Sequence, residues 1–171
     1  MHINIEIKAK CEDHEKIREI LKSLGADFRG VDHQVDTYFK VNHGRLKLRE
    51  GSIEKFLVYY DREDKEGPKK SDVIKSPADS SIKPILESAC GILAIVDKER
   101  EIYFIENVKF HIDIVEELGS FIEIEAMDES GSIGQDKLLE QCNKYLKLFD
   151  VKEEDLLAVS YSDLIIKKNG N

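Results

Sequence analysis

The chain has 171 residues, a formal net charge of −9 and a pI near 5.1. Its length favours one domain over residues 1–171, and its charge excludes a general nucleic-acid or anionic-membrane surface. The three cysteines lack metal-binding spacing and indicate reduced thiols. Strand-like residues begin without a leader, and no apolar run approaches the length of a membrane span. We therefore expect a soluble, cytoplasmic protein.

The first two predicted elements are a strand and an amphipathic helix. From residue 2 to residue 10, apolar residues alternate with polar or charged ones, which is typical of a strand. A helix is predicted over residues 13–24, because apolar residues recur there at spacings of three and four and Gly25 follows as a stop signal. The apolar stripe of this helix would cover the apolar side of a sheet.

The middle of the chain predicts three more strands and a helix. The strands are expected at residues 30–41, 44–50 and 55–61, the first two joined as a hairpin by a turn signal at residues 42–44. Residues 62–73 are dense in charge and include a Gly-Pro pair, which predicts a mobile loop. A second helix is predicted over residues 80–91.

The last part of the chain predicts four strands and a third helix. The strands are expected at residues 92–98, 101–106, 108–115 and 120–127. An amphipathic helix follows over residues 134–148. The total of about eight strands and three helices, without an internal repeat, indicates an α+β fold.

Several predicted strands carry charge on the face opposite their apolar face. Arg45, Lys47 and Arg49 share such a face on one strand. Glu123 and Glu125 share one of opposite sign on another. A solvated sheet surface is the simpler interpretation of any single strand. Because the pattern recurs, it favours a closed barrel with the ionic faces inward, where so many charges require a ligand and a metal of complementary charge.

Glu123 and Glu125 are candidate ligands of a divalent cation. They point the same way from one strand, roughly 6 to 7 Å apart, so their side chains can converge on one ion. Glu6 and Asp113, on other strands, would complete an oxygen site. Such a site suits Mg²⁺ or Mn²⁺ better than zinc. The alternative is a set of surface glutamates in ordinary ion pairs.

Basic side chains on several strands are candidate phosphate ligands, because dispersed donors suit a ligand with several phosphates. Lysine and arginine are also common on solvated faces. The sequence has no glycine-rich phosphate loop, so side chains would have to bind the phosphates. His111 shares the charged face, as an acid, a ligand or a hydrogen-bonding neighbour. The basic candidates are Lys8, Lys47, Arg49, Lys98, Arg100 and Lys109.

The motifs on these strands resemble the CYTH domain, the family of triphosphate tunnel metalloenzymes, in family order from residue 3 to residue 165. The stretches at residues 44–50, 59–62 and 160–164 look closest to the class IV adenylyl cyclase-like branch. The motifs are Ile5-Glu6-Ile7-Lys8, Gln34-x-Asp36-Thr37-Tyr38-Phe39, Leu46-Lys47-Leu48-Arg49, Lys98-x-Arg100, Lys109-x-His111-x-Asp113 and Gly119-Ser120-Phe121-x-Glu123-x-Glu125.

The resemblance implies a closed antiparallel β-barrel of about eight strands with flanking helices. Its ligand would be a triphosphate such as ATP, tripolyphosphate or thiamine triphosphate, and the protein would be a monomer or a homodimer. Glu6 and Lys8 would be catalytic. Mg²⁺ or Mn²⁺ would bind to Glu6, Asp113, Glu123 and Glu125. Phosphate would contact Lys8, Lys47, Arg49, Arg62, Lys98, Arg100 and Lys109.

One position departs from the family pattern. Where the family has Glu-x-Glu-x-Lys, this chain has Asn4 before Glu6 and Lys8, and an amide offers a metal a carbonyl oxygen without charge. We expect a metal-dependent triphosphatase, because the sequence shows no adenine-specific pocket and lacks the His-Phe leader of the cyclases. A class IV adenylyl cyclase, making cyclic AMP and pyrophosphate from ATP, and a non-catalytic module that binds polyphosphate or nucleotide are the alternatives.

Overall fold

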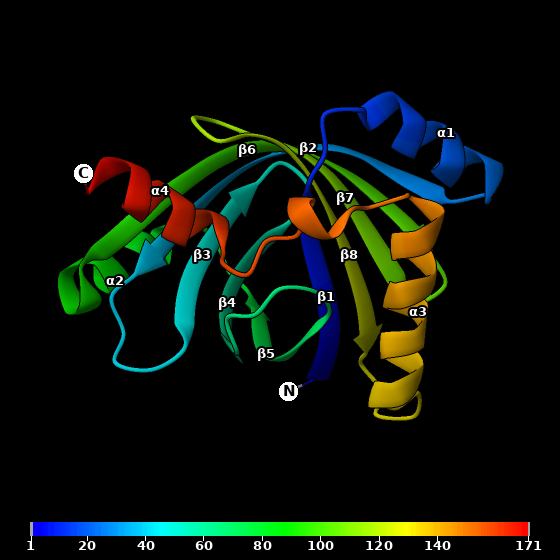
Figure 1. Ribbon diagram of the computed structural model, residues 1–171. Helices are drawn as coiled ribbons and strands as arrows, with labels where there is room; N and C mark the ends of the chain where they lie inside the picture. Colours follow the sequence, from blue (N-terminus) through cyan, green and yellow to red (C-terminus); the bar gives the residue numbers. More distant parts are fainter. Residues whose placement is uncertain (1, 171) are drawn as a thin grey trace.

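Eight antiparallel strands close into a barrel in the computed structural model, which describes residues 2–170 (Figure 1). They follow the order β1-β5-β4-β3-β2-β6-β7-β8, so that each strand pairs on both sides. This closure confirms the barrel predicted from the charged alternation. The strands are β1 (His2–Lys10), β2 (Asp27–Phe39), β3 (Arg45–Gly51), β4 (Lys55–Arg62), β5 (Lys69–Pro77), β6 (Ile92–Ile105), β7 (Val108–Val115) and β8 (Gly119–Asp128).

Two predictions about strands are wrong: one strand was missed and another was predicted as two. The predicted number of eight strands is nevertheless correct. β5 lies in and beyond the segment predicted as a loop at residues 62–73, and its inward side chains Lys69, Ser71 and Val73 are buried. β6 is one continuous strand where two were predicted. Its charged centre stays in the sheet because Lys98 and Arg100 are buried in ion pairs inside the barrel.

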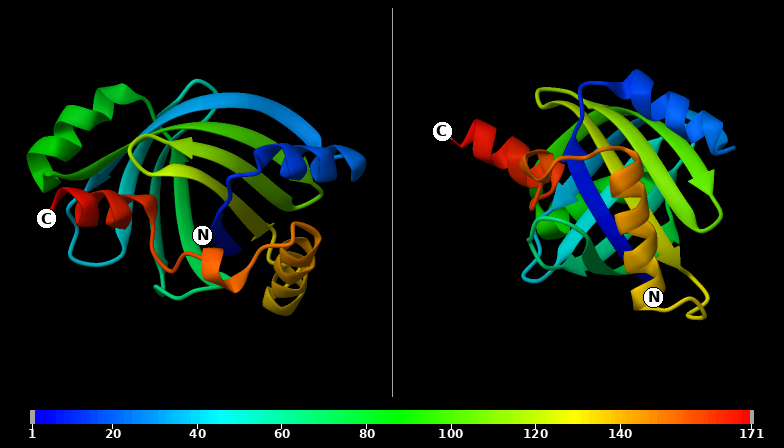
Figure 2. Two further views of the ribbon diagram at one scale, coloured as in Figure 1. Left: turned by 45° about the horizontal axis from the view of Figure 1, so that its top comes forward. Right: turned by 45° about the vertical axis from the view of Figure 1, so that its right-hand side comes forward.

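Two helices cover the outside of β1, β7 and β8: α1 (His14–Ser23) and α3 (Gln135–Leu148) (Figure 2). α1 begins after Asp13, whose side chain accepts a hydrogen bond from the backbone N–H of Lys16. Buried side chains of both helices join those of the three strands in one apolar cluster. Ile5, Phe110 and Ile124 belong to this cluster, as expected for the outward faces of their strands.

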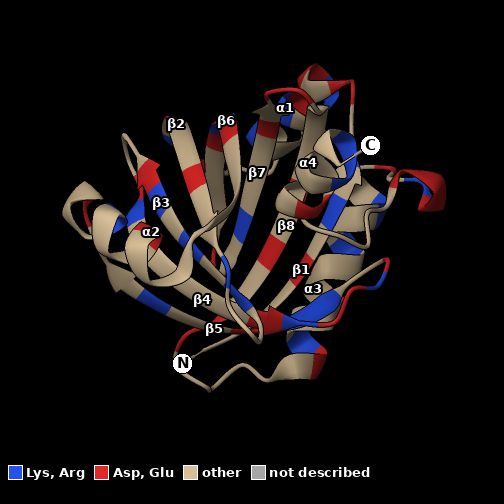
Figure 3. Cartoon of the chain, turned by 90° about the vertical axis from the view of Figure 1, so that its left-hand side faces the viewer, with Lys and Arg blue, Asp and Glu red and all other residues tan. Residues whose placement is uncertain are grey.

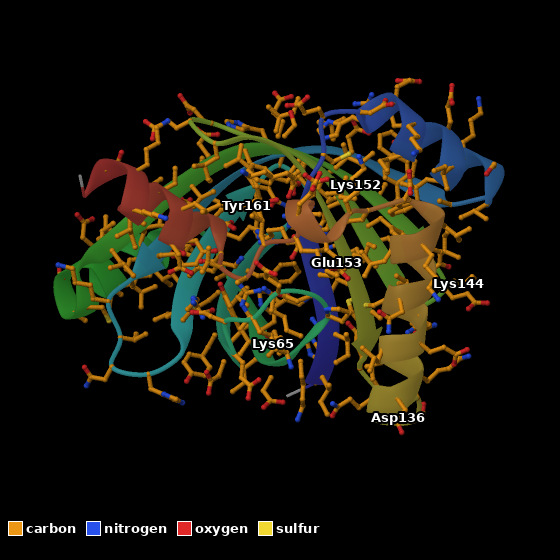
Figure 4. All side chains as sticks on the ribbon, in the orientation of Figure 1. Lys65, Asp136, Lys144, Lys152, Glu153 and Tyr161 are labelled. Atoms are coloured by element: carbon orange, nitrogen blue, oxygen red, sulfur yellow. The ribbon has the colours of Figure 1, made fainter. Side chains whose placement is uncertain are left out.

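The remaining α-helices are α2 (Lys83–Cys90), which was predicted, and α4 (Tyr161–Asn169), which was not. Two short 3-10 helices lie at Ser80–Ile82 and Glu153–Asp155. Ser160 and Asp163 form a capping box at the start of α4. Tyr161, labelled in Figure 4, belongs to a second buried apolar cluster with Phe121 and Val96. α4 therefore brings the end of the chain against the barrel. No helix within residues 2–170 has the length and apolar character needed to cross a membrane.

Candidate active site

The inward faces of the strands line one cavity, and Figure 3 shows acidic and basic residues side by side on the barrel strands. Eight basic side chains and five carboxylates line the cavity, an excess of three positive charges. Such a surface attracts a polyanion. Of the residues predicted for the site, it brings together Glu6, Lys8, Lys47, Arg49, Arg62, Lys98, Arg100, Lys109, Glu123 and Glu125.

One buried carboxylate, Asp36 on β2, contacts three of these cations. Its Oδ2 lies 2.7 Å from Arg49 Nη2, 2.8 Å from Lys98 Nζ and 3.3 Å from Lys47 Nζ. Burial opposes its charge, but the cations hold the pKa of Asp36 well below its ordinary value. Asp36 therefore fixes the positions of three basic groups. No role was predicted for Asp36, because its place opposite Arg49 depends on the register of β2 and β3.

Lys98 is the most deeply buried of the three cations that contact Asp36. Its side chain is 1% exposed. Burial lowers the pKa of Lys98 from 10.5 to about 7, although the carboxylate of Asp36 favours the charged form. A bound polyanion would favour the ammonium further.

Three predicted metal ligands lie on two neighbouring strands. Glu6 of β1 is directly opposite Glu125 of β8. Glu6 is paired with Arg62, whereas Glu123 Oε2 lies 2.9 Å from Arg100 Nη2. Burial raises the pKa of Glu125, and the other carboxylates of the cavity add to the rise. A bound cation would therefore relieve the like charge at Glu125.

The oxygen atoms of Asn4, Glu6 and Glu125 are of the kind that a hard divalent cation binds. Asn4 donates its amide N–H to Glu125, and its own Oδ1 is buried without a hydrogen-bond partner among residues 2–170. An ion held by the two carboxylates would give that oxygen a partner. Among the described residues, no group of three acidic, histidine or cysteine side chains already converges. Metal binding would therefore require Glu6 to exchange Arg62 for the ion.

Asp113, the fourth predicted metal ligand, does not line the cavity. Its carboxylate accepts two hydrogen bonds from Arg100, at 2.6 and 2.7 Å, and one from the Tyr161 hydroxyl at 2.7 Å. Both oxygens are engaged in a fully buried environment. Asp113 thus holds the Arg100 guanidinium in position, and we leave it out of the proposed metal ligands.

His111 lies on the same face and is buried beside Glu123. Its Nδ1 is 3.1 Å from Glu123 Oε2, and its Nε2 has no hydrogen-bond partner in the described part of the chain. Burial and the charge of Arg100 lower the pKa of His111 to about 3. The imidazole is therefore neutral at physiological pH, where it orients Glu123 and does not serve as an acid.

The cavity also has an apolar side that the charge pattern did not predict. Phe56, Val58 and Tyr60 of β4 and Val73 of β5 form this apolar wall. The wall shares its cavity with the charged faces of the other strands. A ligand with both a phosphate chain and an organic group would find contacts for each. Residues 56–60 of β4 are all apolar or aromatic, so the sequence did not show which face of this strand is turned inward.

Comparison with known proteins agrees with this geometry. The model of the CYTH domain family matches residues 2–161, and the chain belongs to this family. A Methanocaldococcus jannaschii protein provisionally named adenylate cyclase is 29% identical over 178 residues, covering 95% of this chain and 98% of that protein. The similarity therefore extends over nearly the whole of both sequences.

Solved structures share the fold. A protein from Pyrococcus horikoshii OT3 is 25% identical with a TM-score of 0.76, and the match covers 96% of this chain and 99% of that one. A Hippeastrum protein, provisionally named an adenylyl cyclase and described as having a dominant triphosphatase activity, is 14% identical with a TM-score of 0.64. That match covers 100% of this chain and 97% of the other. At this identity the likeness shows the fold alone.

Proposed function

We propose that this protein is a divalent-metal-dependent triphosphatase that hydrolyses a triphosphate inside the barrel. The observation that carries the proposal is the meeting of the opposed carboxylates Glu6 and Glu125 with eight basic side chains in one cavity. A triphosphate needs both the basic side chains and a metal held by carboxylates, since it carries several negative charges and binds divalent cations through its oxygens. Membership of the CYTH family supports the same conclusion.

The basic side chains would bind the phosphate chain from several directions. The Nζ of Lys8 lies 4.0 Å from Glu123 Oε1 and 3.9 Å from the centre of the Tyr161 ring. We assign it a catalytic role in stabilising the charge that develops on the phosphate during cleavage. The other basic side chains would orient the phosphate chain of the substrate for in-line attack by water. They are Lys47, Arg62, Lys98 and Arg100. Arg49 and Lys109, the other two predicted phosphate ligands, also line the cavity but are paired with the carboxylate of Glu54.

Glu6, Glu123 and Glu125 would hold Mg²⁺ or Mn²⁺, with Asn4 Oδ1 as a neutral ligand. The ion would supply Lewis-acid stabilisation of the phosphate oxygens. Arg62 would move from Glu6 to a phosphate oxygen when substrate and ion are bound together. The carboxylate and the guanidinium therefore neutralise each other in the empty cavity and serve different partners in the complex.

Class IV adenylyl cyclase is the second candidate function. In that reaction the nucleophile is the ribose 3′-hydroxyl of ATP rather than water, and the same basic groups would bind the triphosphate. Two observations favour it: the provisional name of the M. jannaschii relative, and the apolar wall, against which a nucleobase would pack. The Hippeastrum protein shows that a cyclase name and triphosphatase activity occur together on this fold.

Product analysis separates these functions. The full chain is incubated with ATP, thiamine triphosphate or tripolyphosphate in the presence of Mg²⁺ or Mn²⁺, and orthophosphate, pyrophosphate and cyclic AMP are then separated. Orthophosphate release without cyclic AMP is the result we expect. Cyclic AMP with an equal amount of pyrophosphate would identify a cyclase. Tight binding without any product would identify a binding module, the role that the neutral Asn4 would favour.

A further inference from the structure

The turn between β3 and β4, residues 51–54, is anchored to β2 by the buried carboxylate of Asp32. This carboxylate accepts hydrogen bonds from the backbone N–H groups of Ile53 and Glu54, at 2.8 and 3.0 Å, and from the Ser52 hydroxyl at 2.9 Å. Gly51 fits this turn because a Cβ there would lie 2.6 Å from the Glu54 carbonyl oxygen. The backbone position of Glu54 is therefore fixed.

From this turn the side chain of Glu54 reaches across the barrel. β4 and β7 are separated by three strands in either direction around the barrel, yet the Glu54 carboxylate is paired with Lys109 of β7. Glu54 Oε2 also accepts hydrogen bonds from Arg49 Nη1 and Gln34 Nε2, each at 3.2 Å. The Glu54 carboxylate is thus paired with two of the basic groups that line the cavity, Arg49 and Lys109.

We propose that Glu54 is a specificity-determining residue that limits how many phosphates the cavity accepts. The inference rests on the proposed function, because it assumes that phosphate binds to the basic groups of the cavity. A phosphate that reached both Arg49 and Lys109 would stand beside the Glu54 carboxylate and be repelled by it. Phosphate binding is therefore favourable only at the basic groups that Glu54 does not contact.

Two features keep the Glu54 carboxylate in place when an anion enters. Asp32 holds the backbone of the turn, and Gln34, which is itself buried, donates to the side chain. The carboxylate therefore stays paired with Arg49 and Lys109, in the place that a bound phosphate would otherwise take. The basic groups beyond its reach remain for the substrate: Lys8, Lys47, Arg62, Lys75, Lys98 and Arg100. A longer phosphate chain would have to extend into the region that Glu54 already neutralises.

Calorimetric titration of the full chain with tripolyphosphate and with tetrapolyphosphate tests this inference. Glu54→Gln removes the charge while keeping the size and an acceptor oxygen. We expect the affinity for tetrapolyphosphate to rise about tenfold or more, and that for tripolyphosphate to rise less. The matched control is Glu50→Gln on β3, which removes the same charge from a residue that pairs with Lys83, 2.9 Å away, and does not line the cavity. This control should leave both affinities unchanged.

An equal change in both affinities, or none relative to the Glu50→Gln control, would overturn the role of Glu54. Glu54→Ala removes the same charge together with the acceptor oxygens and should shift the preference in the same direction. If the wild-type chain bound neither polyphosphate, both the proposed function and this inference would fail. If it bound tripolyphosphate but the preference of the variants did not shift, only the inference about Glu54 would fail.

Discussion

The side-chain amide of Asn4 donates a hydrogen bond to the carboxylate of Glu125 across the pair of strands β1 and β8. Asn4 occupies the position at which the family pattern has a glutamate. Its amide contacts a carboxylate whose pKa is raised by burial. This contact identifies Asn4 as a neighbour of the proposed metal site and not as a residue on the outer surface.

Asn4→Glu should tighten metal binding, because it places a charged oxygen ligand beside Glu6 and Glu125. The apparent metal constant for turnover should fall, with the largest gain in activity at low metal concentration. The melting temperature of the metal-free protein should fall as well, since the new carboxylate repels its neighbours. Asn4→Gln, which keeps the amide, is the control. Unchanged metal dependence in Asn4→Glu would remove this position from the site.

Glu125→Gln and Glu123→Gln should both abolish most turnover but differ in stability. Loss of either carboxylate should reduce turnover by more than the roughly 10- to 100-fold that loss of an outer partner of a metal ligand costs. Glu125→Gln should not lower the free energy of unfolding without metal, because burial already disfavours this charge. Glu123→Gln should lower it by about 1–3 kcal/mol, because Arg100 loses a hydrogen-bonded partner.

Chemical denaturation without metal and turnover across a Mg²⁺ and Mn²⁺ titration measure these effects. Full activity of either variant at ordinary metal concentrations would contradict the assignment of that glutamate as a ligand.

Triphosphate binding should take up a proton near pH 8 through Lys98. The pKa of this buried lysine is about 7 in the free protein, so a bound polyanion, which favours the ammonium, should raise it. Binding should then weaken as the pH rises from 7 toward the pKa in the complex, because the free protein must gain the proton. Titration calorimetry in buffers of different ionisation enthalpy measures the uptake. It should disappear in Lys98→Arg, and an undiminished uptake in that variant would assign the proton to another group.

Tyr161→Phe should test whether the phenol hydroxyl serves only to position Asp113. The variant loses a buried hydrogen bond of 2.7 Å, which should cost about 1 kcal/mol of stability. The aromatic ring beneath Lys8 is kept, so turnover should stay within a few-fold of wild type. Tyr161→Ala removes both contacts and should lose far more. A loss of turnover in Tyr161→Phe as large as in Tyr161→Ala would place the hydroxyl in the chemistry.

The alternation of charged and apolar residues predicted the closed barrel, but not every strand in it. β5 was missed because its sequence, with few apolar residues, follows a charged Gly-Pro segment, and its pairing with β1 and β4 depends on distant partners. β6 was predicted as two strands because its centre is charged. This centre stays in the sheet because Lys98 pairs with Asp36 and Arg100 pairs with Asp113. Ser160 and Asp163, which cap α4, were a readable helix signal.

The candidate site was predicted where its residues share a strand face, and missed where it depends on contacts across the barrel. Glu123 and Glu125 follow from period two alone. Asp36 and Glu54 do not, because one acts through the register of two strands and the other through a turn that directs a side chain to the opposite wall. Asp113 shares a strand face with His111, but its hydrogen bonds with Arg100 and Tyr161 depend on contacts with other strands and with α4.

The most direct test of the account is orthophosphate release from inorganic tripolyphosphate as divalent metal is removed and restored. Tripolyphosphate has no hydroxyl group that would serve as a nucleophile for cyclisation, so any cleavage of it is hydrolysis. We predict steady release with Mg²⁺ or Mn²⁺, loss of release when the metal is chelated, and recovery when it is added back. Absence of orthophosphate release from tripolyphosphate, ATP and thiamine triphosphate at every metal concentration, whether or not the protein binds them or forms cyclic AMP from ATP, would contradict the assignment as a triphosphatase.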